Sequence, residues 1–263
     1  MTPGVGVHDD AVGSLSVKVQ GQREQVMKKF GLRKRIEQQL RVWLGRAYRP
    51  AKVDDLGATM FGDGGYGAWP CLAERLHRDS VVYSVGIGFD VQFDRALIER
   101  FGLTVHGFDP TPRVAGWLQD NPPPDAFKFY PLGLAWIDGE LSFAAPTEAT
   151  AVSGTVVPEA VADQPTVSIP VARLETMMRD LGHDHLDVLK MDIEGAEYAV
   201  LDDMLQSDIL PDQLLVEFHH GKRKKGRFPV AETRKRVADL LARDYKIFWA
   251  SESGRELAFA RCR

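Results

Sequence analysis

Two stretches of the chain end in acidic and histidine side chains that can take up a proton or hold a cation. The stretch "LDVLKMDIEG" supplies Asp192 and Glu194, and "LLVEFHH" supplies Glu217, His219 and His220. Both groups follow a short apolar run of the kind that forms a buried strand. Because the carboxyl ends of parallel strands meet at one edge of a sheet, we expect the two groups to face each other.

Histidine titrates near neutral pH, and His219 is the predicted catalytic base. It lies two residues after Glu217 and therefore on the same side of an extended strand, opposite Asp192. The same three side chains could instead bind a divalent cation that lowers the pKa of a hydroxyl group. Spacing does not decide between a base and a cation, and a histidine here could also be a packing residue. Asp192, Glu217 and His219 are therefore the predicted catalytic residues, without a required metal.

A third stretch, "VVYSVGIGFD" at 81–90, carries two glycines that would let a ligand approach bare backbone. Gly86 and Gly88 end an apolar run, and Asp109 in "VHGFDPTP" follows about twenty residues later. In a doubly wound sheet, an acid at that distance binds the hydroxyls of a ribose. The pattern favours a nucleoside ligand, with a tight strand-to-helix turn as the alternative.

The neighbours of the glycines indicate which nucleoside fits. A dinucleotide-binding fold has a third glycine where this chain has Val91, and the charge of Asp90 would repel a pyrophosphate. The same acid suits a ligand with a cationic end, such as a sulfonium or an amino group. The sequence contains no GxxxxGK[ST] phosphate-binding loop. S-adenosylmethionine is therefore favoured over NAD.

Strand-like and helix-like segments alternate around these residues, which predicts an α/β fold with a doubly wound, mostly parallel sheet. Strands are predicted at 81–87, 104–109, 128–135, 186–192 and 214–219, with two more in "YKIFWAS" and "ELAFARC". Helices are predicted at 92–101, 171–182, 196–206 and 229–243. The polar, proline-bearing stretch 144–166 is predicted to be a long loop.

The N-terminal part of the chain differs from the rest. Residues 1–17 are small and aperiodic, which predicts a tail. Residues 18–54 are strongly basic, with leucine and isoleucine at helical spacing, and predict an amphipathic helical extension. This extension would pack on a catalytic domain at 55–263, or alternatively contact an anionic partner.

The stretch "LDVLKMDIEGAEYAVLDDML", 186–205, resembles the signature of FkbM-type methyltransferases, whose fourth strand ends in a K-x-D-x-E-G-A-E motif. "VYSVGIGFDVQFD", "DGGYGAW" and "LLVEFHH" resemble a branch of methyltransferase-like proteins in which Ser84 replaces the usual acid of the glycine motif. The resemblance covers about residues 55–260. It implies a seven-stranded, Rossmann-like class I methyltransferase fold that binds S-adenosylmethionine.

The resemblance also implies the residues that bind S-adenosylmethionine. Asp109 would hold the ribose beside Pro110, and "PLGLAW" at 131–136 would line the adenine. Asp192 would lie beside the methionine end and the acceptor. Because Ser84 offers only a neutral hydrogen bond, Asp90 is expected to take over part of the role of the missing acid. The residues expected around the methionine part are Ser84, Val85, Gly86, Ile87, Gly88 and Asp90, and those expected at the adenine include Leu132 and Gly133.

Composition adds limits. The 263 residues carry a formal net charge of -4, so nothing global favours nucleic acid as a partner. Cys71 and Cys262 lack the paired spacing of a zinc site or disulfide framework. With no signal-like or membrane-spanning run, a cytoplasmic protein is expected. The number of subunits does not follow from the sequence.

Methyl transfer mainly requires an aligned acceptor and a group that removes its proton. We therefore expect an S-adenosylmethionine-dependent methyltransferase that acts on an oxygen of a small molecule or sugar. The basic stretch "GKRKKGRF" at 221–228 would favour an anionic acceptor, although such runs are usually solvated. Tyr66 and Trp69 could stack on a sugar or on the cofactor. The alternatives are an NAD-dependent oxidoreductase and a non-catalytic nucleoside-binding module that acts through its basic helix.

Overall fold

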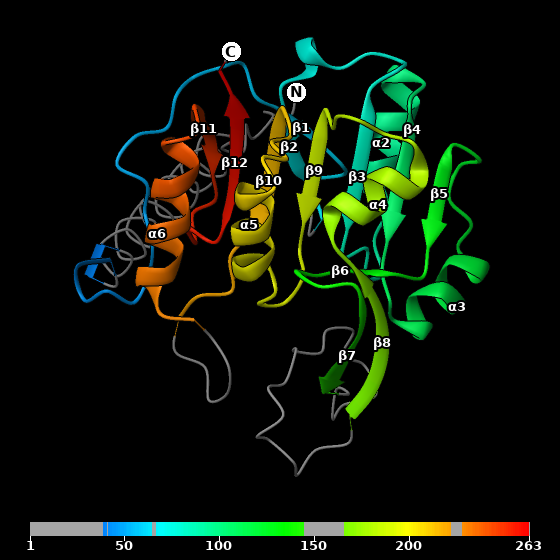
Figure 1. The fold of residues 1–263 in the computed structure, drawn as a ribbon. Coiled ribbons are helices and arrows are strands. Elements are labelled where there is room, and N and C mark those ends of the chain that lie inside the picture. The colour runs from blue at the N-terminus through cyan, green and yellow to red at the C-terminus, as the bar shows by residue number, and fades with distance from the viewer. Residues whose placement is uncertain (1–38, 41, 65–66, 145–165, 222–227, 263) are drawn as a thin grey trace, which may run out of the picture. The chain divides into compact units, whose positions relative to one another are not determined.

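The computed structural model describes residues 39, 40, 42–64, 67–144, 166–221 and 228–262 (Figure 1). The tail at 1–17, most of the basic extension at 18–54, Tyr66, and most of the stretches 144–166 and 221–228 lie outside these residues. The chain divides into two bodies, Met1–Gly45 and Arg46–Arg263. Everything below concerns the second body, and the predicted domain boundaries stay predictions.

A seven-stranded sheet forms the centre of this body, in the order β11-β12-β10-β9-β3-β4-β5 (Figure 1). All neighbours from β10 to β5 are parallel, whereas β12 runs antiparallel to both β10 and β11. This is the class I methyltransferase fold, and the predicted α/β fold is confirmed. In sheet order, the strands are β11 (Tyr245–Ala250), β12 (Glu256–Arg261), β10 (Gln213–Glu217), β9 (Val188–Met191), β3 (Val81–Val85), β4 (Thr104–Phe108) and β5 (Phe127–Tyr130).

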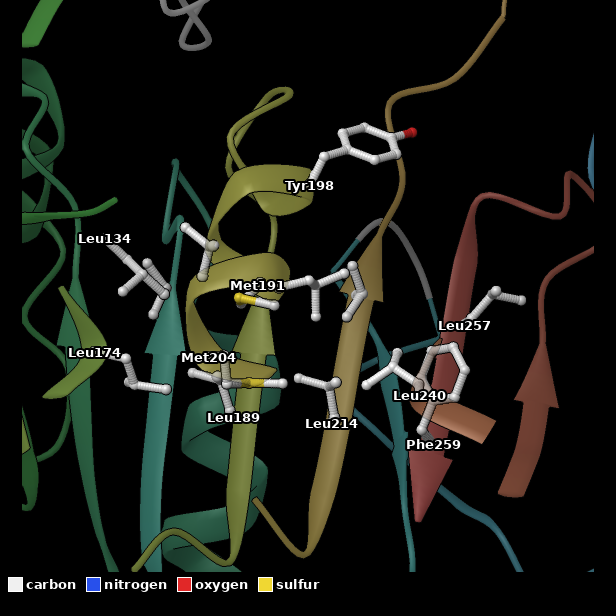
Figure 2. Close-up of a cluster of buried hydrophobic side chains, with 14 of the residues drawn as sticks. Leu134, Leu174, Leu189, Met191, Tyr198, Met204, Leu214, Leu240, Leu257 and Phe259 are labelled. Carbon is white, nitrogen blue, oxygen red and sulfur yellow. The ribbon is translucent and has the colours of Figure 1, made fainter. Parts of the chain in front are cut away.

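Helices cover both faces because the central strands are apolar on both sides. One face packs against α4 (Leu174–Leu181), α5 (Glu197–Gln206) and α6 (Val230–Leu241). Figure 2 shows part of this core, where Leu189 and Met191 of β9 lie against Met204 of α5. The opposite face packs against α2 (Gln92–Phe101), α3 (Pro112–Asp120), the 3-10 helix η1 (Ala73–Arg75) and the antiparallel pair β1 (Thr59–Phe61) and β2 (Trp69–Cys71).

A separate three-stranded sheet, in the order β6-β8-β7, lies beyond the carboxyl ends of β4 and β5 in Figure 1. It consists of β6 (Gly133–Leu134), β7 (Gly139–Ala144) and β8 (Thr166–Ala172). The strand predicted at 128–135 is wrong in this respect, because it divides between two sheets. Pro131 lacks an N–H for a ladder, and the Leu132 N–H donates back to the Tyr130 carbonyl at 2.8 Å.

The other predicted segments agree with the structure to within two residues, with one exception. The helix predicted from residue 171 begins only at Leu174, because the preceding β-branched residues pair with β7. The strands β1, β2, β7 and β8, the 3-10 helix η1 and the helix α3 were not predicted. Within the described residues, no helix has the length and apolar character needed to span a membrane.

Two helix starts place side chains at the sheet edge. Helix α2 begins at Gln92, whose N–H donates to Asp90 Oδ1 at 2.7 Å, so Asp94 falls in its first turn. Helix α5 begins at Glu197, directly after a turn in which Glu194 and Gly195 adopt positive φ angles of 52° and 109°. A residue other than glycine is strained in the left-handed region, and such strain is common at functional sites. Glu194 lies just after β9, close to Asp192.

Candidate active site

A cavity of about 720 Å³ opens at the carboxyl ends of β3, β4, β9 and β10. This volume suits a nucleoside-sized ligand together with part of a second molecule. Its walls come from the loop after β3, the end of β4, the small three-stranded sheet, the ends of β9 and β10, and the segment between β11 and β12. The lining residues used below are Trp69, Val85, Gly86, Ile87, Gly88, Asp90, Asp94, Asp109, Pro110, Gly133, Lys190, Asp192, Glu194, Glu217, Trp249, Ser251 and Glu256.

The loop after β3 needs glycine for a reason that is visible within the protein itself. Gly86 has a φ of 76°, and a Cβ there would lie 1.8 Å from the carbonyl oxygen of Asp192. Backbone of the loop therefore touches backbone at the end of β9, which no other residue type permits. The turn proposed as the alternative to a ligand site is real at this position, and the same turn forms one wall of the cavity.

Asp109 links the end of β4 to the glycine loop. Its Oδ2 accepts a hydrogen bond from the Gly88 N–H at 3.0 Å, and its Oδ1 accepts from the Thr111 N–H at 2.9 Å. The side chain is 5% exposed and lines the cavity. Two N–H donors fix the carboxylate in one orientation, which pre-organises its remaining lone pairs for a ligand.

Two residues expected at the cofactor do not line the cavity. Ser84 is fully buried on the β3 face that carries Val82, because successive side chains of a strand point to opposite faces. Leu132 packs on the main core instead, while its neighbour Gly133 lines the cavity. Asp90 does line the cavity, although its Oδ1 already accepts the N–H of Gln92.

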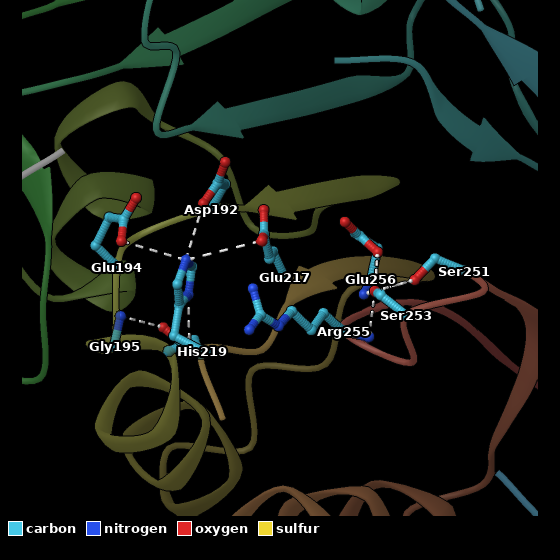
Figure 3. Close-up of polar contacts among 10 residues, drawn as sticks. Asp192, Glu194, Gly195, Glu217, His219, Ser251, Ser253, Arg255 and Glu256 are labelled. Atoms are coloured by element: carbon cyan, nitrogen blue, oxygen red, sulfur yellow. Dashed lines mark hydrogen bonds and ion pairs between the residues drawn. The ribbon is translucent and has the colours of Figure 1, made fainter. Parts of the chain in front are cut away.

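The predicted catalytic residues come together at the ends of β9 and β10 (Figure 3). His219 Nε2 lies 3.7 Å from Asp192 Oδ1 and 3.9 Å from Glu217 Oε1. Glu194 Oε2 is nearer still, at 3.4 Å from the same nitrogen. Asp192, Glu194 and Glu217 line the cavity, whereas His219 lies behind them and is 6% exposed. We refer to Asp192, Glu194, Glu217 and His219 as the acidic-histidine group.

A fully buried glutamate orients the histidine from the other side. Glu197 Oε1 accepts the backbone N–H of His219 at 2.7 Å and lies 3.2 Å from its Nδ1, while Glu197 Oε2 accepts the Gly195 N–H at 2.7 Å. This places a proton on Nδ1 and turns Nε2 toward the three carboxylates. The sequence did not reveal this contact, because an acid in the first turn of a helix is common without any further role.

The pKa values in the acidic-histidine group are shifted. Burial alone would lower the pKa of His219, but the hydrogen bond to Glu197 and the charges of Glu197, Glu194 and Glu217 raise it to about 9. Burial and the neighbouring Asp192 raise the pKa of Glu217 to about 7, against the opposing charge of His219. Burial also raises the pKa of Asp192. At neutral pH, His219 therefore carries a proton, and Glu217 is close to its midpoint.

Ligand atoms of Asp192, Glu194 and His219 all lie within 4.8 Å of one another. A divalent cation could bridge this distance. The three residues differ from the predicted metal ligands, because Glu194 takes the place of Glu217.

The sequence model of the FkbM methyltransferase domain matches residues 86–247, more than half of the chain. The chain belongs to the FkbM methyltransferase family. Two curated relatives are described as probable methyltransferase-like protein 24. The Rattus norvegicus protein is 29% identical over 140 residues, covering 52% of this chain and 32% of the relative. The Homo sapiens protein is 27% identical over 158 residues, covering 57% and 37%.

The matched region thus spans about a third of the length of these relatives. Among solved structures, a Methanococcus jannaschii fibrillarin pre-rRNA processing protein aligns over 81% of this chain and 85% of its own, with 11% identity and a TM-score of 0.38. That likeness is too distant to bear on function.

Within this FkbM methyltransferase domain, the K-x-D-x-E-G-A-E motif has a physical explanation. Lys190 is buried under the glycine loop, and its Nζ donates to the Gly86 carbonyl at 3.1 Å. Asp192 and Glu194 line the cavity, and Glu197 holds His219. One short motif therefore connects the glycine loop with the acidic-histidine group.

Proposed function

We propose that this domain is an S-adenosylmethionine-dependent methyltransferase that transfers the methyl group to an oxygen of a small molecule or sugar. The observation that supports it most is a single cavity. It joins the glycine loop and Asp109 to Asp192 and Glu217, so a nucleoside and a second molecule could be bound in contact. Membership of the FkbM family favours this function over an NAD-dependent oxidoreductase.

The residues present fit S-adenosylmethionine. The Asp109 carboxylate is held at the cavity wall, where it can accept hydrogen bonds from ribose hydroxyls. Asp94, also on the wall, has a buried carboxyl oxygen without a hydrogen-bond partner among the described residues. When bound, S-adenosylmethionine supplies a methyl group activated by its sulfonium charge. The protein then has to align the acceptor and remove its proton.

Glu217 is the better placed base. It lines the cavity, and its pKa near 7 allows it to accept a proton at neutral pH. His219 was the predicted base, but it lies behind the carboxylates and its pKa near 9 keeps it protonated. We therefore propose that Glu217 removes the proton of the acceptor hydroxyl. The positively charged His219 would orient Glu217 and Asp192. The assignment is a proposal for all three residues.

The acceptor side of the cavity favours a neutral, hydroxyl-rich molecule. Its described wall carries Asp192, Glu194, Glu217 and Glu256, which would repel an anion and accept hydrogen bonds from hydroxyls. Trp249 on the same wall offers a ring face against which a sugar can pack. The prediction of an anionic acceptor was based on the basic stretch at 221–228. Residues 222–227 of that stretch lie outside the part of the chain that the structure describes.

The test of the proposed function is calorimetric titration with S-adenosylmethionine, S-adenosylhomocysteine and NAD in parallel. We expect the first two to bind and NAD not to bind. A transfer assay with labelled S-adenosylmethionine and a panel of sugars and phenols follows. Binding of NAD alone would overturn the proposal, whereas binding of S-adenosylmethionine without transfer to any acceptor would favour a non-catalytic nucleoside-binding module.

A cytoplasmic location remains part of the proposal. Both cysteines are free in the structure, with Cys71 buried and Cys262 half-buried. Free thiols are compatible with a reducing compartment. Fractionation of the cells that produce the protein tests this point.

A further inference from the structure

Asp94 and Lys190 are two buried charged residues beside the glycine loop, and neither belongs to the acidic-histidine group. Both side chains line the cavity, and both are more than nine-tenths buried, with 2% exposure for Asp94 and 7% for Lys190. Charged side chains are rarely buried to this degree unless something pairs with them. The nature of that partner follows from their geometry.

Asp94 has an unsatisfied oxygen. Within the described residues, its Oδ1 has no partner in hydrogen-bonding geometry, and the Ser84 hydroxyl, which lies close enough to lower the pKa of the carboxyl, is also without one. Burial raises the pKa of this carboxyl, with Lys190 and Ser84 acting in the opposite direction. A buried acceptor of this kind is costly until a donor reaches it, and a cationic donor would favour its ionised form.

Among the residues that the structure describes, Lys190 makes one side-chain hydrogen bond. Its Nζ donates to the Gly86 carbonyl at 3.1 Å and lies 5.7 Å from the centre of the Trp69 ring. An ammonium has three donors, so further hydrogen bonds remain available. Among the described ion pairs, none joins Lys190 to Asp94, and the two opposite charges are therefore not in direct contact. A ligand with a cationic and an anionic group would match both.

We propose that Asp94 and Lys190 bind the amino-acid end of S-adenosylmethionine, with Asp94 accepting from the α-ammonium and Lys190 donating to the α-carboxylate. The proposal rests on the proposed function and names residues for one end of the cofactor. Lys190 is positioned by β9, where it donates to the Gly86 carbonyl at the end of the parallel neighbour β3, and Asp94 is positioned by the first turn of α2.

The position of Ser84 gives independent support. Ser84 and Lys190 are register partners on β3 and β9, and Asp94 lies on the helix that covers the same face. The acid that the glycine motif lacks at Ser84 is therefore supplied from α2, ten residues later. Asp90, which was expected to take that role, already receives the Gln92 N–H at 2.7 Å.

The experiment is a comparison of ligands across variants by calorimetry. The ligands are S-adenosylhomocysteine, its analogues that lack either the α-amino group or the α-carboxylate, and 5′-methylthioadenosine, which lacks both. The variants are Asp94→Asn and Lys190→Met. Matched controls are Glu99→Gln, an exposed acid on the same helix, and Lys246→Met, an exposed lysine. Thermal melting without ligand checks that each variant is folded.

We expect Asp94→Asn and Lys190→Met each to weaken S-adenosylhomocysteine binding about tenfold or more, since each removes a charge-assisted hydrogen bond. Binding of 5′-methylthioadenosine should stay within about twofold of wild type. Asp94→Asn should become insensitive to removal of the α-amino group, and Lys190→Met to removal of the α-carboxylate. Both controls should behave as wild type.

Four other outcomes have different meanings. Equal weakening of S-adenosylhomocysteine and 5′-methylthioadenosine would show that the two residues only support the fold, and unchanged binding would remove them from the site. If either variant fails to fold, the wild-type protein still decides, because equal affinity for the full ligand and both truncated analogues overturns the proposal. If wild type binds none of the four ligands, the proposed function itself fails.

Discussion

The two halves of the cavity are held in different ways. On the glycine-loop side, Asp109 is fixed by two hydrogen bonds of 2.9–3.0 Å to backbone N–H groups, and Gly86 is in backbone contact with β9. On the acidic-histidine side, three carboxylates surround His219 Nε2 at 3.4–3.9 Å, beyond good hydrogen-bonding distance. The first half is set by backbone geometry, whereas the second depends on which groups carry protons.

This difference predicts that substitutions in the two halves alter different measurements. Substitutions on the glycine-loop side should change the affinity for S-adenosylmethionine. Changes in the acidic-histidine group should appear in the rate and its pH dependence, with affinity nearly constant. Four predictions test the separation.

The largest effect is expected for Glu217→Gln. Loss of the proposed base should lower the methyl-transfer rate by roughly 10²–10⁴ in single-turnover assays with an identified acceptor. Affinity for S-adenosylhomocysteine, measured by calorimetry, should remain near wild type. A variant that keeps full activity would exclude Glu217, and a larger loss in His219→Gln would return the role of base to His219.

The pH profile distinguishes the same two residues without mutation. A base works only when deprotonated, so the rate should rise about tenfold per pH unit below the pKa of the base and level off above it. Glu217 predicts a plateau above pH about 7, since burial and Asp192, together with the charges of Glu256 and Glu194, raise its pKa to that value. A rate that keeps rising to pH about 9 would instead indicate His219.

Asp109→Ala should change affinity. Removing its charge-assisted hydrogen bonds should weaken S-adenosylmethionine binding by about 1.5–3 kcal/mol. Part of that loss would come from the Gly88 N–H, which loses its acceptor. Asp125→Ala, an exposed acid before β5, serves as the control. Wild-type affinity in a folded Asp109→Ala protein would take Asp109 out of the cofactor site.

The smallest effect is expected from metal removal. With Glu217 as base, a chelator should leave the transfer rate unchanged within error. Loss of activity with a chelator and its return with Mg²⁺ or Mn²⁺ would show that Asp192, Glu194 and His219 hold a cation. Asp192→Asn would then be at least as damaging as Glu217→Gln.

The sequence predicted what depends on strand periodicity. The seven strands and the positions of Asp109, Asp192 and Glu217 at strand ends follow from apolar runs and the residues directly after them. Ser84, expected at the methionine part, is buried under α2 and does not line the cavity, whereas Lys190 and Asp94 on the same face of the sheet do. A glycine motif defines a loop, but it does not say which neighbouring side chains reach the cavity.

Long-range contacts were harder to predict. Asp94 and Glu197 each occupy the first turn of a helix, where an acid needs no other explanation than the helix dipole. The residues that act on them, Lys190 by its charge on Asp94 and His219 by a hydrogen bond to Glu197, are far away in the sequence and come near only after the sheet forms. The small sheet was missed because its strands flank the stretch 145–165, whose composition resembles a loop.

The contact between Gly86 and the Asp192 carbonyl makes the two halves mechanically dependent. With Lys190 also bonded to the Gly86 carbonyl, the loop after β3 is attached to β9 by its backbone and by a side chain. A ligand that holds this loop in place therefore also stabilises the strand end that carries Asp192. Amide hydrogen exchange at residues 191–195 should then slow when a nucleoside binds at Asp109, even if nothing occupies the acceptor side.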